Sequence, residues 1–186
     1  GLGAVLSMEL IGMGVGSLVL GGSADKFGRR PTMLFCLVLM AIGMFLATTA
    51  TRPQILSAYR VITGFGIGGM LAATNAAVFE MSSRKHRALA MALMVIGYPI
   101  GAFLGGLNSA ELLKSHDWRA VFMFGAIMTT IFLPLVWLFV PETPAWLAQA
   151  RPANALERIN ATLVRFGHQP VTELGPQAPH EAEANL

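Results

Sequence analysis

The sequence has few charged residues: Asp, Glu, Lys and Arg make up 12% of its 186 residues, whereas hydrophobic residues make up 54%. Soluble domains carry about 25% charged residues, and a soluble domain of this length would need more charge to cover its surface. The mean hydropathy is +0.60. The composition therefore argues against a soluble globular protein and predicts a membrane protein with several spanning segments.

Patterns for metal binding, catalysis and nucleic-acid binding are lacking as well. The single cysteine, Cys36, cannot form an internal disulfide and fits as a small packing residue in an apolar run. The four histidines are scattered without the spacing of metal ligands. The basic segments lack interleaved aromatic residues, and the net charge is only +3. We therefore expect no enzyme, metal, cofactor or nucleic-acid partner.

Five apolar stretches are long enough to cross a bilayer, because about 20 residues at 1.5 Å per residue span a hydrocarbon core of about 30 Å. Three of them are uncharged, and two carry one charge each, Glu9 and Arg60. Backbone groups in lipid must be bonded internally, which favours helices. We predict an all-α membrane bundle in residues 1–141, with spans at 2–22, 31–51, 54–79, 88–110 and 120–141.

Basic residues are unequally distributed between the two predicted sides of the membrane. Nine lie on the side that holds residues 21–31, and three lie on the opposite side. The positive-inside rule places the richer side in the cytoplasm. On that side we expect a cytoplasmic amphipathic helix region at 142–167, with its helix at 152–166, and a disordered cytoplasmic linker at 168–186.

The stretch GGSADKFGRRP, residues 21–31, joins two predicted spans. Small residues before Asp25 permit a close helix neighbour. An acid at the membrane edge needs a cation or a helix N-terminus beside it. A plain positive-inside anchor is the alternative, but it would not need this acid or these glycines. The candidate gating residues are Gly21, Asp25, Lys26, Gly28, Arg29 and Arg30.

The spacing Gly21-x-x-x-Asp25-Lys26-x-Gly28-Arg29-Arg30 resembles the loop signature of the major facilitator superfamily, which joins the second and third helices. The resemblance implies a charge latch between two halves of a transporter. Glu80 is a further candidate, because an acid here often joins the latch; an exposed surface pair with little effect is the alternative. The five spans then resemble helices two to six, so the expected partners include a missing first helix and a C-terminal half.

Two charged residues lie within predicted spans, where charge is costly and commonly functional. Arg60 faces the interior or a watery cavity, or alternatively snorkels to the interface. Glu9 is a protonatable group in a cavity or a partner of Arg60. The pattern Arg60-x-x-x-Gly64-x-Gly66 resembles the fourth-helix motif of the superfamily, whose arginine is linked to proton or substrate handling.

Two sets of glycines at four-residue spacing predict close helix packing. Gly64 and Gly68 follow Arg60 in one span, and Gly97, Gly101 and Gly105 share a face in the next. Pro99 predicts a kink in the latter. Antiporters of the superfamily carry a Gly-Pro pair here; Gly101 is followed by Ala102, which favours a symporter or facilitator.

The segments PETPAWL and RPANALERINATLVRFG are similar to the aromatic acid:proton symporter branch, although metabolite and sugar branches stay open. We therefore expect part of a secondary active transporter that moves a small organic solute, such as an aromatic acid, across a bacterial inner membrane together with protons. The alternative is a non-transporting membrane scaffold that binds partner proteins.

Overall fold

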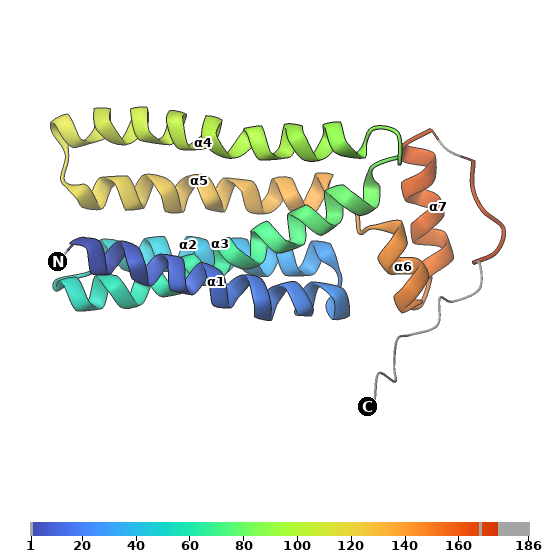
Figure 1. Ribbon diagram of the computed structural model, residues 1–186, viewed down its shortest axis with the longest axis horizontal. Helices are drawn as coiled ribbons and strands as arrows, with labels where there is room; N and C mark the ends of the chain where they lie inside the picture. The colour runs from blue at the N-terminus through green and yellow to red at the C-terminus, as the bar shows by residue number, and fades with distance from the viewer. Residues whose placement is uncertain (1, 168, 175–186) are drawn as a thin grey trace.

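The computed structural model describes residues 2–167 and 169–174, and all regular secondary structure in these ranges is α-helical. Five helices are long and apolar enough to cross a membrane, which confirms the predicted all-α membrane class. They lie side by side as a bundle, and two short helices lie at one end (Figure 1). The long helices are α1 (Leu2–Phe27), α2 (Arg29–Thr48), α3 (Pro53–Met81), α4 (Arg87–Ser115) and α5 (Trp118–Phe139); the short ones are α6 (Pro144–Ala150) and α7 (Ala155–Arg165).

The connection between α1 and α2 is much shorter than the sequence suggested. α1 continues to Phe27 instead of ending at residue 22, and α2 begins at Arg29, so Gly28 alone separates them. Gly28 has a φ of 111°, a backbone conformation that residues with a side chain rarely adopt. The chain therefore reverses direction at one glycine, and Asp25 lies in the last turn of a helix rather than in a loop.

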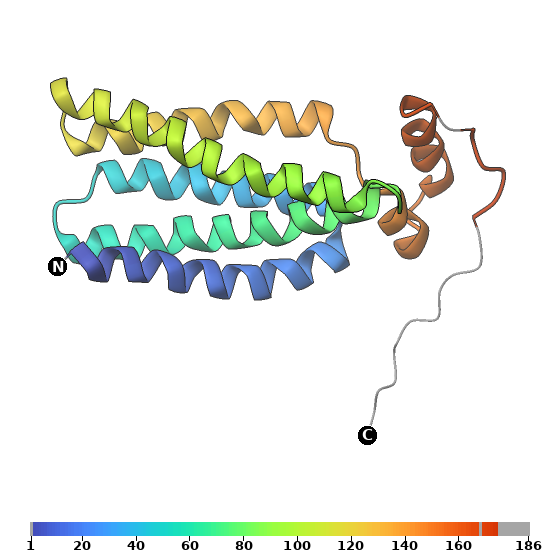
Figure 2. The ribbon, with the colours of Figure 1, turned by 45° about the horizontal axis from the view of Figure 1, so that its top comes forward.

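The packing centres on α3, which lies against both α1 and α2, while α2 also packs against α5. Ala24, Met33, Ala73 and Ala77 form a buried cluster where α1, α2 and α3 meet. α4 differs, because it has no buried residue among those described. It runs as one helix through Pro99, beside α5 (Figures 1 and 2).

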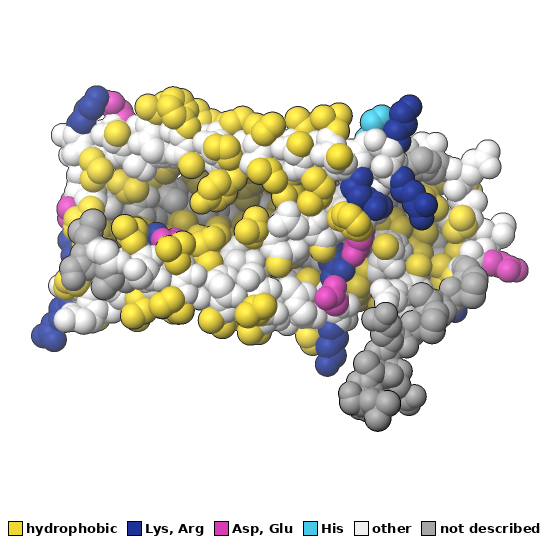
Figure 3. Space-filling model, viewed as in Figure 1, with side chains coloured by type: hydrophobic (Ala, Val, Ile, Leu, Met, Phe, Trp, Pro, Cys, Tyr) yellow, Lys and Arg dark blue, Asp and Glu magenta, His cyan; other side chains and the backbone are white. Residues whose placement is uncertain are grey.

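The outer surface suits a lipid environment. Hydrophobic side chains cover the length of the bundle, and charged side chains gather mainly at its two ends (Figure 3). The face in view is hollowed between the α1–α3 layer and the α4–α5 pair. One acidic and one basic side chain are visible inside this hollow, nearer the end of the bundle at which α1 begins.

The two short helices lie at the end of the bundle where α1 turns into α2 (Figure 1), which we call the Gly28 end. α6 begins with Pro144, whose fixed φ suits a first helical turn, and it was not predicted as a helix. α7 lies within the predicted range 152–166 and buries Ile159. Of the predicted linker, residues 169–174 are outside any helix, and residues 168 and 175–186 lie outside the described residues.

Candidate functional site

Three helix ends meet at Arg29, the first residue of α2. Its guanidinium Nη1 donates to Oδ1 of Asp25 at 2.5 Å, and its Nη2 donates to Oε1 of Glu80 at 2.5 Å. The Arg29 side chain is only 11% exposed, and that of Glu80 is 19% exposed. The structure thus brings two of the predicted gating residues, Arg29 and Glu80, together in a network that joins the ends of α1, α2 and α3.

Glu142 is part of the same site, although no motif in the sequence pointed to it. Its carboxylate accepts the backbone N–H of Arg29 at 2.9 Å, of Arg30 at 3.3 Å and of Thr143 at 3.1 Å. The first N–H groups of a helix have no partner within the helix and carry its positive dipole end, so a carboxylate stabilises them. Glu142 is 4% exposed and acts as the N-terminal cap of α2.

The position of Glu142 also explains why residue 28 is glycine. A Cβ at this position would lie 2.5 Å from Oε2 of Glu142, in addition to the strain of the positive φ. The available sequence signal was an acid between two prolines, Pro141 and Pro144, directly after a span. That signal does not reveal the partner, because 113 positions separate Glu142 from Arg29.

The end of α5 and the segment after it contact Arg30, Glu80 and Asp25. The Arg30 guanidinium donates to the carbonyl oxygen of Trp137, which has no helical donor because Pro141, four residues on, lacks an N–H. The Thr143 hydroxyl donates to Oε2 of Glu80 at 2.6 Å. Trp146 Nε1 donates to the backbone oxygen of Asp25 at 2.9 Å.

The remaining motif residues lie at the edge of this network. Gly21 faces α3, where a Cβ would lie 3.4 Å from that of Ala72. Lys26 is exposed and its ammonium lies 5.6 Å from the centre of the Phe27 ring. Lys26 takes no part in the ion pairs formed within the described part of the chain.

A second charged pair lies within the spans. Glu9 of α1 and Arg60 of α3 form an ion pair, and their side chains are 16% and 17% exposed. The Arg60 guanidinium also lies 5.5 Å from the centre of the Phe122 ring of α5, which packs edge-on against Trp118. Pairing with Arg60 was one of the two alternatives predicted for Glu9, and the structure contains this pair.

A cavity of about 660 Å³ lies one helical turn from this pair, toward the end opposite Gly28. Its lining includes Val5, Leu56 and Trp118, each four residues before Glu9, Arg60 and Phe122 respectively. This volume lies in the range of small-molecule sites. The arginines that line the cavity are Arg52 and Arg119, whereas Arg60 is not among its lining residues.

The predicted packing glycines fall into two groups. At Gly64 a Cβ would collide with the backbone oxygen of Glu9, and at Gly68 with that of Met13, so α1 and α3 touch at the backbone. Around Gly97, Gly101 and Gly105, nothing in the described structure lies within 4 Å of where a Cβ would be. Their predicted close packing is not made by the described chain.

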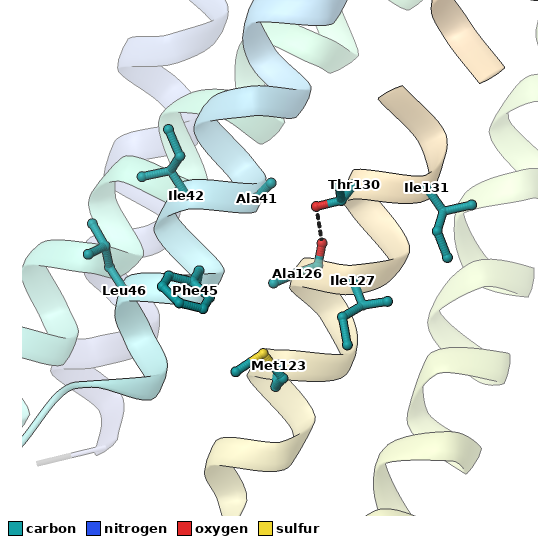
Figure 4. A pocket seen from close by; sticks show the side chains of 9 residues that line it. All are labelled: Ala41, Ile42, Phe45, Leu46, Met123, Ala126, Ile127, Thr130 and Ile131. Carbon is teal, nitrogen blue, oxygen red and sulfur yellow. Dashed lines mark hydrogen bonds between the residues drawn. The ribbon is translucent and has the colours of Figure 1, made fainter. Parts of the chain in front are cut away.

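A second cavity, of about 490 Å³, is a groove between α2 and α5 (Figure 4). Its lining is apolar, from Phe45 on one wall to Met123 on the other, apart from the Thr130 hydroxyl, which donates to the backbone oxygen of Ala126. It has no charged or titratable group and suits hydrocarbon. No described group of three His, Cys, Asp or Glu side chains is placed to hold a metal ion.

The sequence profile of the Major Facilitator Superfamily matches residues 1–177, and the chain belongs to this superfamily. The chain is 31% identical over 165 residues to the gallate transporter of Pseudomonas putida, covering 89% of this chain and 36% of the relative. It is 30% identical over 173 residues to the 4-hydroxybenzoate transporter PcaK of Acinetobacter baylyi, covering 92% and 38%.

Solved structures show the same fold. The xylose transporter XylE from E. coli, in a partially occluded inward-open conformation, superposes with a TM-score of 0.75 at 21% identity, covering 87% of this chain and 43% of that one. The chain thus spans less than half the length of these relatives. The predicted superfamily is confirmed. These relatives are named as transporters, so the comparisons do not favour the alternatives of an enzyme or a scaffold.

Proposed function

We propose that this chain is part of a proton-coupled secondary transporter that moves a small aromatic acid across the inner membrane of a bacterium. Bacterial relatives named for gallate and 4-hydroxybenzoate support this substrate class. The proposed transporter works by alternating access, in which this bundle rocks against a second helical unit around a site near the bilayer midplane.

The observation that carries the proposal is the Glu9–Arg60 ion pair within the spans. A guanidinium binds a carboxylate through paired hydrogen bonds, so the acid group of a solute can replace Glu9 on Arg60. Protonation of Glu9 removes its charge and releases Arg60 for the solute. Binding of proton and solute is then linked, and Phe122 next to Arg60 offers a face for an aromatic ring.

The Asp25–Arg29–Glu80 network is the proposed gate. The excess of basic residues at the Gly28 end favours a cytoplasmic location for it. Arg29 and Glu80 hold three helix ends together there, and a contact with the second unit at this end would form and break as the bundles rock. Asp25 is the accessible member, with a side chain that is 72% exposed.

The test is uptake of labelled 4-hydroxybenzoate by the full-length protein in proteoliposomes under an imposed pH gradient. R60Q is expected to abolish uptake, because the solute carboxylate loses its cation. E9Q is expected to remove the response to the pH gradient while counterflow exchange persists. D25N is expected to lose most uptake although the protein still inserts, and residues 1–186 alone are expected not to transport.

K114Q is the matched control, since Lys114 is exposed and remote from both charged sites. Uptake by R60Q at the level of K114Q would refute the proposed substrate site. A D25N variant with unchanged uptake would refute the gate alone.

A further inference from the structure

The turn between α3 and α4 carries a cluster of basic side chains that the rest of the fold leaves unpaired. Arg84 and Lys85 are exposed in this turn, and Arg87 begins α4. Within the described part of the chain, none of these three takes part in an ion pair. The arginines at the start of α2 differ, because Arg29 is held by two acids and Arg30 by the Trp137 carbonyl.

Arg87 is held in one position, and at least one of its N–H donors has no acceptor among the described residues. Its guanidinium carbon lies 4.0 Å from the centre of the Phe79 ring, a stacked cation–π arrangement. Its Nε is shielded from solvent and has no hydrogen-bond partner among the described residues. A shielded donor without an acceptor is unfavourable, so the site favours an acceptor brought by another molecule.

The surroundings of the cluster are apolar and face outward. Phe79, Met81 and Leu89 flank the turn and are 50%, 38% and 58% exposed. α3 and α4 both have the length and composition of membrane spans, so the turn between them lies at the membrane surface. Figure 3 shows Lys and Arg side chains gathered beside a histidine at this corner of the molecule, next to hydrophobic side chains.

We propose that the α3–α4 turn is a binding site for an anionic phospholipid. Arg84, Lys85 and Arg87 hold the headgroup phosphate, and the acyl chains lie along Phe79 and Leu89. The adjacent exposed apolar residues favour a lipid over a free phosphate ion, which would use the charges alone. This site is independent of the proposed substrate and of the gate.

The experiment titrates the delipidated, full-length protein with phosphatidylglycerol and counts retained lipid by native mass spectrometry. Each basic side chain near a membrane surface contributes about fivefold to anionic lipid binding. R84Q is therefore expected to weaken retention about fivefold, and R84Q/R87Q further. The matched control is R158Q/R165Q, which removes two exposed arginines from α7 at the same end of the molecule.

Two further arms identify the ligand. Phosphatidylcholine is expected to be retained weakly and equally by all variants, and soluble glycerol 3-phosphate is expected not to displace phosphatidylglycerol. Equal loss in R84Q/R87Q and R158Q/R165Q would overturn the proposal, because general charge attraction would then suffice. Displacement by glycerol 3-phosphate would also overturn it in favour of a phosphate site. R84Q alone guards against misfolding, since Arg84 is exposed in a turn.

Discussion

α3 and α4 are both helices of 29 residues with glycines at four-residue spacing, yet they have opposite surroundings. The glycines of α3 touch the backbone of α1, and α3 buries residues on faces toward two neighbours. α4 buries no described residue, and no described atom lies within 4 Å of where a Cβ would be on its glycines. The comparison teaches that a stripe of small residues indicates a face able to receive a helix, but not whether the same chain supplies that helix.

The two helices also differ in how their charges are used. Arg60 and Glu80 of α3 pair with Glu9 of α1 and Arg29 of α2. The Glu111–Lys114 pair of α4 lies within one helix, and both side chains are at least 70% exposed. α3 therefore links the described bundle through both backbone contact and ion pairs, whereas α4 forms no described ion pair with another helix.

The largest expected effect comes from breaking the charge contact of α3 with R60M. Removal of one partner from a buried pair leaves an uncompensated charge and costs about 3–5 kcal/mol of unfolding free energy. The double variant E9Q/R60M should lose much less, because neither charge remains. Denaturant titration of the purified variants measures the free energy of unfolding of R60M and of E9Q/R60M. Equal losses in the two variants would show that the pair has no special role in stability.

An intermediate effect is expected from the backbone contact. G68A places a methyl group against the Met13 carbonyl and should cost about 1–3 kcal/mol, the usual range for overpacking. G101A in the same 186-residue chain should be neutral or stabilising by up to about 1 kcal/mol, since alanine is the better helix former. Thermal unfolding compares them. If G101A destabilises only a longer form of the protein, the neighbour of α4 comes from outside this chain.

The smallest effect is expected for K114Q on α4. An exposed pair three residues apart contributes about 0.2–0.5 kcal/mol, and salt screens it. The same unfolding assay at low and high salt is the check. A loss as large as that of R60M would show that α4 is more tightly bound into the bundle than its exposure indicates.

The sequence was sufficient for features set by local composition. Long apolar runs predicted the five spans, because crossing a bilayer constrains length and polarity strongly. The cost of charge near lipid pointed to Glu9 and Arg60, and the structure contains the pairing considered for them. Glu80 came from the resemblance to the superfamily, and it contacts Arg29.

The rest depends on contacts between distant segments. Glu142 caps α2 only because the end of α5 folds back onto the start of α2, and no local pattern states this. α6 is only seven residues long, too short for a clear hydrophobic period. The polar residues 21–27 suggested a loop, but α1 continues through them, and the side chain and backbone oxygen of Asp25 accept hydrogen bonds from α2 and α6.

The single glycine between α1 and α2 has a mechanical consequence. Only one residue links these two membrane-length helices. Neither helix can therefore move along the membrane normal without moving the other. Glu142, three residues after the C-terminal end of α5, fastens this turn to that end of α5. The Arg30 guanidinium adds a second link, to the Trp137 carbonyl of α5, so a tilt of α1 would be passed to α5 through both contacts.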